Sequence, residues 1–266
     1  MDENIRNAGE DHPEAVPAEA PAPQAPAVAA PEPISTAEAV TGTFLSPGGT
    51  FKRIVERHWT FVAVPLVLIM IFNVVSVVLM RNRVDMKQLV RDQIRQSRFA
   101  DQLSDAQIEE AAEREASRPA AFTAVFACLF LVVTVLFLAA LFWLVLLAFG
   151  FDINFKRSLL AVGFAMLPMV VAAVLFVVIL FIKDPNSIDI QNAVATNPAA
   201  FLDREATAKP LYVLLQSLDL FKAWMIFLLS VGLAAAARSR VAPAATAVVV
   251  LYLVWIGVRM ALAAIF

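Results

Sequence analysis

The sequence predicts an all-α membrane protein: a five-helix transmembrane bundle with a disordered N-terminal tail and an extramembrane helical hairpin between spans one and two. Of its 266 residues, 60% are hydrophobic and only 17% are charged, and the mean hydropathy is +0.74. Ordinary soluble domains are about half apolar and about one quarter charged. Moreover, five stretches reach the roughly 20 apolar residues that a helix needs to cross a bilayer. They lie at about 60–80, 121–149, 159–182, 211–236 and 244–265.

Residues 1–44 are predicted to be a disordered tail. They are rich in Pro and Ala and carry eight Asp or Glu and one Arg. Such a segment has almost no aromatic or β-branched side chains to bury, so it cannot offset the entropy lost on ordering. It is interpreted either as a docking segment for partners or as a solvated tail without one.

The stretch LSPGGTFKRIVERHW, residues 45–59, is predicted to be an interfacial amphipathic helix. Ser46-Pro47 is a helix start signal, and apolar side chains then recur at helical spacing. Basic residues fall mostly on the other faces, and a tryptophan closes the segment at headgroup level. The expected membrane-interface anchors are Lys52, Arg53, Arg57 and Trp59.

The basic residues also predict the orientation of a multi-pass protein in the cytoplasmic (inner) membrane. The loops GFDINFKRS and ARSRVA are short, more basic than acidic, and on the same side as 45–59. The positive-inside rule places them and the N-terminus in the cytoplasm and the C-terminus on the opposite side. The loop 81–119 has eight basic and eight acidic residues. The predicted topology places this loop outside the cytoplasm, against the rule. The topology is kept because three other basic segments support it.

This loop is predicted to form the helical hairpin. Residues 84–98 place Met86, Val90 and Ile94 four apart, and Ser104 with Gln107 opens a second helix in a capping-box pattern. The first half is net basic and the second net acidic, which favours an antiparallel pair on the membrane surface. The alternative is one continuous solvated helix.

No pattern of catalytic residues is found. The P-loop, HExxH, GxSxG and GxGD patterns are missing, and His12 and His58 have no nearby Cys or His with which to bind a metal. The single Cys128 excludes an internal disulfide. We therefore expect no enzyme activity, no metal and no cofactor, and a net charge of −2 gives no indication of nucleic-acid binding.

Charges inside the spans are the most informative polar features. Asp219 and Lys222 fall in the fourth span, and Arg259 falls in the fifth, seven residues before the C-terminus. At ~1.5 Å per residue, Asp219 and Arg259 both lie roughly 10–12 Å from the outer surface. The matched depth predicts an ion pair between them, acting as structural glue or lining a proton or substrate route. Alternatively, Arg259 reaches the outer headgroups by itself.

Four other polar or helix-breaking residues fall in the spans. Pro65 and Pro168 are expected to kink spans one and three, because a proline frees a carbonyl. Asn73 and Gln216 are expected to hydrogen-bond across helices.

Three stretches carry a family resemblance: LSPGGTFKRIVERH, GFAMLPMVVAAVLF and LDLFKAWMIFLLSVGLAAAARSR. Together they resemble the bacterial branch of the Yip-one (Ypt-interacting protein) domain family, over roughly residues 45–266. The resemblance implies an integral membrane protein without known catalysis. In eukaryotes the family is linked to Rab-type GTPases and vesicle traffic through a cytosolic N-terminal region. This chain reads AFGFDINFKR where the eukaryotic motif DLYGP stands.

The expected function is that of a non-enzymatic polytopic membrane scaffold or adaptor that recruits partners or organises lipid. Its expected partners are membrane lipid and proteins that bind the tail and the cytoplasmic loops, and self-association into a homo-oligomer is left open. The alternative is a small transporter or channel subunit that uses the cluster of Asp219, Lys222 and Arg259.

Overall fold

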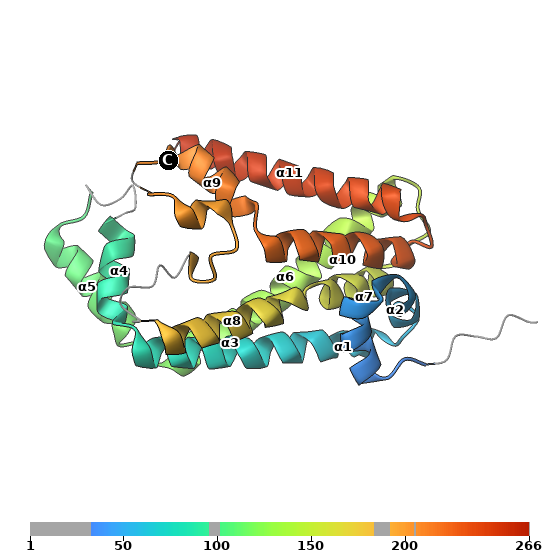
Figure 1. The fold of residues 1–266 in the computed structure, drawn as a ribbon, viewed down its shortest axis with the longest axis horizontal. Helices are drawn as coiled ribbons and strands as arrows, with labels where there is room; N and C mark the ends of the chain where they lie inside the picture. Colours follow the sequence, from blue (N-terminus) through green and yellow to red (C-terminus); the bar gives the residue numbers. More distant parts are fainter. Residues whose placement is uncertain (1–32, 96–101, 184–191, 205, 266) are drawn as a thin grey trace, which may run out of the picture. The chain divides into compact units, whose positions relative to one another are not determined.

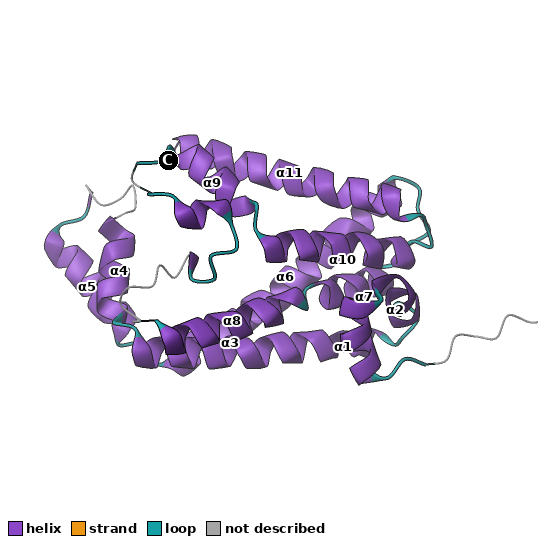
Figure 2. Ribbon diagram, viewed as in Figure 1, coloured by secondary structure: helices purple, strands orange, loops and turns teal. Residues whose placement is uncertain are grey.

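The computed structural model describes residues 33–95, 102–183, 192–204 and 206–265. Within these ranges every regular element is a helix (Figures 1 and 2). The helices are, in chain order, α1 (Thr36–Leu45), α2 (Pro47–Ile54), η1 (Trp59–Val62), α3 (Ala63–Arg83), α4 (Met86–Arg95), α5 (Asp105–Ala116), α6 (Ala120–Ala148), α7 (Phe155–Ala165), α8 (Pro168–Ile182), η5 (Pro198–Phe201), α9 (Lys209–Ser217), α10 (Leu220–Ala236) and α11 (Val241–Ile265).

Four helical segments in the described part of the chain are long and apolar enough to cross a membrane. A fifth is added if the bent pair α9 and α10 counts as one span. Large apolar side chains on these helices face outward, such as Phe130, which is 73% exposed, and Phe137, which is 64% exposed. Apolar helices of this length with apolar outer faces belong in lipid. The protein is therefore a multi-pass membrane protein. The four segments are Trp59–Arg83, Ala120–Ala148, Phe155–Ile182 and Val241–Ile265.

The helix α1 forms where the sequence predicts disorder. Ser35 caps its N-terminus. Ala39 is fully buried, and the ring of Phe44 meets that of Trp224 in α10 edge to face at 5.3 Å. Burial against the bundle stabilises α1, although the segment itself has few large apolar side chains. The prediction that the disordered tail extends to residue 44 is therefore corrected. The rest of the predicted tail, residues 1–32, lies outside the described residues.

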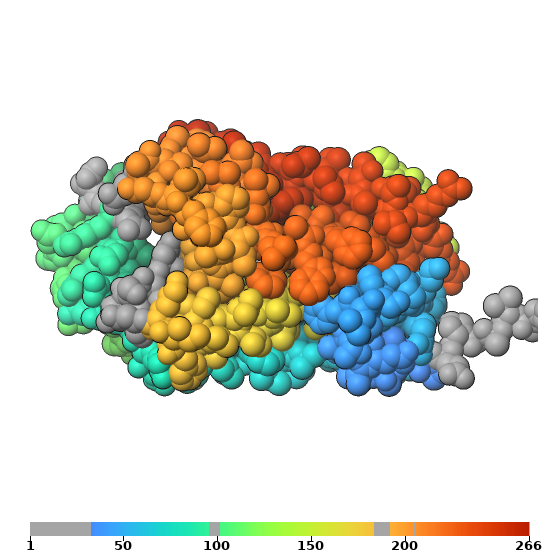
Figure 3. Space-filling model, viewed as in Figure 1, coloured from blue at the N-terminus to red at the C-terminus, as the bar shows by residue number. Residues whose placement is uncertain are grey.

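The helix α2 is inserted into the bundle, which corrects the expectation that its apolar face rests on lipid. Phe51 and Ile54 are 0% exposed. The ring of Phe51 lies against Gly232 of α10, where an added Cβ would come within 2.9 Å of it. Figure 3 shows the N-terminal residues, in blue, in contact with the orange residues of the later helices.

The core is concentrated where α2, α7 and the second half of α10 meet. Every residue from 158 to 165 in α7 is buried, as is the run 228–234 in α10. The helix α7 packs against α6, α10 and η1, and therefore has neighbours on several sides. By contrast, α3 and α8 pack against each other but bury only two residues each.

Pro65 lies near the start of α3, whereas Pro168 lies inside the segment Phe155–Ile182, where α7 gives way to α8. Pro65 lies in the first turn of α3, and Pro168 is the first residue of α8. A proline in a first turn removes no hydrogen bond that the helix needs. The third span is interrupted at Pro168, because α7 ends at Ala165, whereas Pro65 leaves the interior of α3 unbroken.

Candidate functional site

The stretch 211–236, predicted as one continuous span, is broken into α9 and α10, which meet at 54°. The cause is local. Asp219 has an extended backbone, and its carboxylate caps α10 by accepting a hydrogen bond from the N–H of Lys222 at 3.0 Å. An aspartate at this position satisfies an N–H that has no partner inside the helix. Asp219 is therefore a helix cap and not a charge within a continuous helix.

A loop and a neighbouring helix satisfy the polar groups that the break frees. The carbonyl of Thr196 accepts from the N–H of Leu220 at 3.1 Å, and the Thr196 hydroxyl donates to Asp219. The hydroxyl of Tyr252 in α11 donates to the carbonyl of Ser217. Irregular backbone at membrane depth is tolerated only when its polar groups are paired in this way. The break is thus held in place by two other parts of the chain, the loop at Thr196 and the helix α11.

Two cations lie beside the break. The ammonium of Lys222 donates to the carbonyl of Gln216 at 3.1 Å. Arg259 of α11 donates to the side-chain oxygen of Gln216 at 3.2 Å and to the hydroxyl of Ser217 at 3.4 Å. Gln216 therefore hydrogen-bonds across helices, as expected from the sequence. For Asn73, in contrast, the side-chain oxygen is buried without a partner among the described residues.

The structure brings Asp219, Lys222 and Arg259 together, but it does not pair Asp219 directly with Arg259. Within the described residues the two oxygens of Asp219 accept from Lys222 N–H and from Thr196, while Arg259 turns to Gln216. The expected ion pair is corrected, because the cap competes for the carboxylate. A cap residue directly before an apolar run was the sequence signal that could have revealed the break.

Two cavities open at the break and share Thr196, Asn197 and Asp219 in their walls. The first has a volume of about 410 Å³, and polar side chains form a large part of its wall. The second has a volume of about 650 Å³ and is mostly apolar. The first is lined in addition by Gln216, Lys222 and Arg259, and the second by Phe201, Leu218 and Ile226.

Asn197 lines both cavities and is held by a short chain of hydrogen bonds. The residue is 7% exposed, and its side-chain nitrogen donates to the oxygen of Asn192 at 3.2 Å. The nitrogen of Asn192 in turn donates to the hydroxyl of Tyr212 at 2.7 Å, which fixes the direction of the chain of hydrogen bonds. The side-chain oxygen of Asn197 has no partner in the described part of the chain. This oxygen is enclosed by the protein, so it does not face either cavity.

At the other end of α10, the carboxylate of Glu56 joins three segments of the chain. It pairs with Arg157 of α7 at 3.0 Å and with Arg238 after α10 at 3.3 Å. Burial raises the pKa of Glu56, but the hydrogen bond from Arg238 and the charge of Arg157 outweigh it, so the pKa lies below its ordinary value. We call this region the basic end. It comprises Lys52, Arg53, Arg57, Lys156, Arg157, Arg238 and Arg240.

The four expected interface anchors all lie at or next to the basic end. Lys52 is exposed, and Arg53 pairs with Glu38. Arg57 lies over the ring of Phe61 at 4.9 Å, and Trp59 is 52% exposed. Contact between these side chains and lipid headgroups remains a prediction, as does the orientation of the protein in the membrane.

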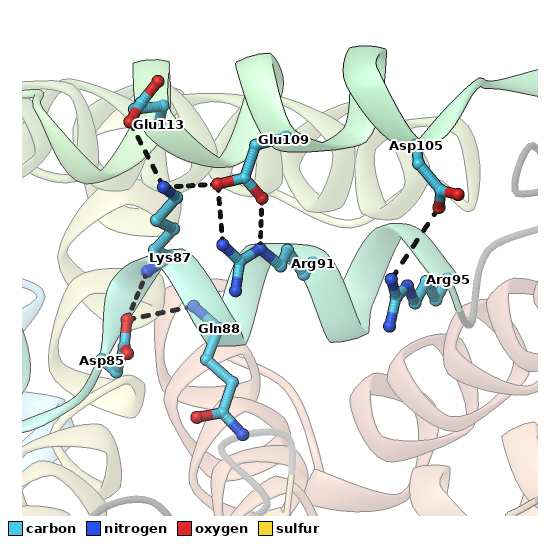
Figure 4. A network of polar contacts seen from close by, with 8 residues as sticks. All are labelled: Asp85, Lys87, Gln88, Arg91, Arg95, Asp105, Glu109 and Glu113. Atoms are coloured by element: carbon cyan, nitrogen blue, oxygen red, sulfur yellow. Dashed lines mark hydrogen bonds and ion pairs between the residues drawn. The ribbon is translucent and has the colours of Figure 1, made fainter.

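The predicted helical hairpin falls on α4 and α5, which pack together between the first two spans. Arg91 donates to both oxygens of Glu109, at 2.6 and 2.7 Å, and Lys87 pairs with Glu109 and with Glu113 (Figure 4). The hydrogen bonds from Arg91 and Lys87 lower the pKa of Glu109 to about 2. The turn between the helices, 96–101, lies outside the described residues, and contact with the membrane surface remains a prediction.

Within the described ranges, no three His, Cys, Asp or Glu side chains gather in a group that could hold a metal ion. That no catalytic residue, metal or cofactor is present remains an expectation from the sequence.

The comparisons with known proteins agree with the motifs. No curated protein and no solved structure matches the chain significantly. The family model described as Yip1 domain, in contrast, matches residues 41–262, from within α1 to within α11. This match confirms the resemblance to the family, without testing its bacterial branch, and covers most of the chain. The chain belongs to the Yip1 domain family.

Proposed function

We propose that this protein is a non-enzymatic membrane scaffold or adaptor that holds protein partners or anionic lipid at its basic end. The observation that carries the proposal is the insertion of α2 between α7 and α10, which ties the N-terminal segment to the bundle. The Yip1 family is not a family of known enzymes, which supports a non-enzymatic role.

Close packing fixes the N-terminal segment at two points. An added Cβ at Gly42 would lie 2.5 Å from the hydroxyl of Thr50, so α1 and α2 approach each other closely. Phe51 occupies the space that Gly232 leaves open. A partner bound to the residues before α1 would therefore be tethered to a rigid part of the membrane domain, as an adaptor requires.

The exposed positive charges also favour the basic end as the binding region. Lys52, Lys156 and Arg240 are exposed there. We place this end in the cytoplasm, because short basic segments stay on that side. Exposed Lys and Arg next to a span also attract the anionic lipids of the cytoplasmic leaflet.

The test is purification in mild detergent with mass spectrometry, comparing the full chain with one lacking residues 1–32. The deletion must stop before Ile34, which is 2% exposed and belongs to the core. A second variant, Lys52→Glu with Lys156→Glu and Arg240→Glu, reverses the charge of the basic end. Its matched control reverses three exposed cations elsewhere, Arg95, Arg114 and Lys183.

A stoichiometric protein partner that is lost with residues 1–32 or with the basic-end variant, but kept by the control, is the expected result. If all four chains purify as the same oligomer with the same lipids, the adaptor proposal is wrong.

A second candidate, a small transporter or channel subunit, is favoured by the break between α9 and α10. Transporters commonly bind their substrates where a broken helix starts again inside the membrane. In proteoliposomes a transporter would carry phosphate or chloride faster than protein-free vesicles do. Asp219→Asn combined with Arg259→Gln would abolish that flux. A scaffold would show no flux in either form and would keep its partners in both.

A further inference from the structure

We propose that the two cavities at the α9–α10 break bind an aminophospholipid such as phosphatidylethanolamine. Its ammonium–phosphate headgroup would occupy the polar cavity, and acyl chain would enter the apolar one. This inference goes beyond the scaffold function and does not depend on it, because the break lies at the opposite end of α10 from the basic end.

The two cations that line the polar cavity, Lys222 and Arg259, have unused N–H donors. A lysine ammonium has three N–H donors and an arginine guanidinium has five. Lys222 uses one of its donors on Gln216, and Arg259 uses two, on Gln216 and Ser217. Asp219 is the only carboxylate that lines this cavity within the described residues, so the side chains leave a net positive charge. Lysine and arginine together are suited to bind a phosphate.

The carboxylate in the shared wall calls for a donor group on the same ligand. Asp219 accepts two hydrogen bonds, from Lys222 N–H and Thr196, and a carboxylate can accept about four. A primary ammonium has three donors and a positive charge, and would satisfy this carboxylate. A phosphate alone would bring a second negative charge to Asp219 and no N–H donor.

The apolar cavity decides between a lipid and a free zwitterion. Its volume of about 650 Å³ is ample for a stretch of acyl chain, and Phe201, Leu218 and Ile226 lie in its wall. It meets the polar cavity at Thr196, Asn197 and Asp219. A polar chamber that continues into an apolar one fits an amphiphile, whereas free phosphoethanolamine would use only the first.

The experiment measures binding of short-chain lipids to the purified full chain in a maltoside detergent, which has no phosphate. The probes are the dihexanoyl forms of phosphatidylethanolamine, phosphatidylcholine and phosphatidylglycerol, together with free phosphoethanolamine. We expect phosphatidylethanolamine to bind at least about tenfold more tightly than phosphatidylcholine, whose quaternary ammonium has no N–H donor. Equal affinity for these two lipids would overturn the proposal.

Variants test the two halves of the site separately. Asp219→Asn should largely remove the preference for phosphatidylethanolamine over phosphatidylcholine, because the amide keeps one oxygen for the cap of α10 and loses the second acceptor and the charge that face the ammonium. Arg259→Gln should weaken all three lipids by about tenfold or more. Arg114→Gln, on the exposed face of α5, is the control and should change neither value. A preference that survives Asp219→Asn contradicts the headgroup assignment. Free phosphoethanolamine binding as tightly as the lipid contradicts the lipid assignment.

Discussion

The two ends of α10 are built in opposite ways. At its C-terminal half the run 228–234 is buried, and Gly232 admits the ring of Phe51. At its N-terminal end Leu220 is 63% exposed, and two cavities adjoin the cap at Asp219. One end is filled by apolar side chains from several helices, while the other leaves polar groups incompletely partnered. A single helix thus links a region that stabilises the fold to a region that is open to a ligand.

The contrast has a physical basis in what each end can tolerate. A close-packed core loses free energy when any volume is removed, so it cannot also provide an open cavity. A site with unused donors and acceptors loses stability by being unfilled, and therefore depends on a packed region elsewhere. Substitutions at the two ends should accordingly differ in size and in kind.

The largest effect is expected at the packed end. Phe51→Ala should lower the free energy of unfolding by about 3–5 kcal/mol, because it empties a space enclosed by α7 and α10. Phe130→Ala, on the exposed face of α6, should cost less than about 1 kcal/mol. Titration into a denaturing detergent, followed by circular dichroism, measures both. Similar losses for the two variants would show that Phe51 is not part of a close-packed core.

A smaller effect is expected at the break. Asp219→Ala should cost about 1–2 kcal/mol, because it leaves an N–H of α10 without its cap. Asp219→Asn keeps an oxygen in the capping position and should cost much less. Ser104→Ala, which removes the cap of α5 outside the spans, serves as a comparison at about 1 kcal/mol. If Asp219→Asn is as destabilising as Asp219→Ala, the charge of Asp219 matters more than its role as a cap.

Hydropathy predicted the membrane helices well but could not place the break. The spans are visible in the sequence because apolar length alone decides whether a helix can cross a bilayer. The break at Asp219 depends on Thr196 and Tyr252, which come from other parts of the chain. Hydropathy averaged over residues 211–236 shows only that the stretch is apolar, so it predicts one continuous helix.

The same reason explains the misplaced N-terminal boundary and the missing ion pair. The stretch 33–45 is poor in large apolar residues, yet Phe44 and Ala39 pack against α10 and its neighbouring helices. The matched depth of Asp219 and Arg259 was inferred from residue counts along straight helices. The sequence predicted that Asp219 and Arg259 lie near each other, but it did not predict their hydrogen-bond partners. At the break Asp219 caps α10 and Arg259 hydrogen-bonds to Gln216.

The smallest effect on the whole fold is expected in the α4–α5 pair, which is held by exposed charges and belongs to neither end of α10. Because the pKa of Glu109 is lowered from an ordinary 4.5 to about 2, its ion pairs contribute fully above pH 4.5. Their contribution is lost as the pH falls from 4.5 towards 2, since the separated helices then bind the extra proton more readily. The pair should separate in this window while the spans remain folded.

Spin labels at Gln93 and Ala106, with Cys128 replaced by serine, would follow this separation as a distance distribution that broadens at low pH. Glu109→Gln should give the broad distribution already at pH 7, because its neutral amide cannot pair with Arg91 and Lys87. Glu110→Gln, whose partner Arg114 lies within α5 itself, is the matched control and should stay narrow at pH 7. A distance that does not change between pH 7 and pH 3 in the unaltered chain would mean that apolar contact, and not charge, holds the two helices together.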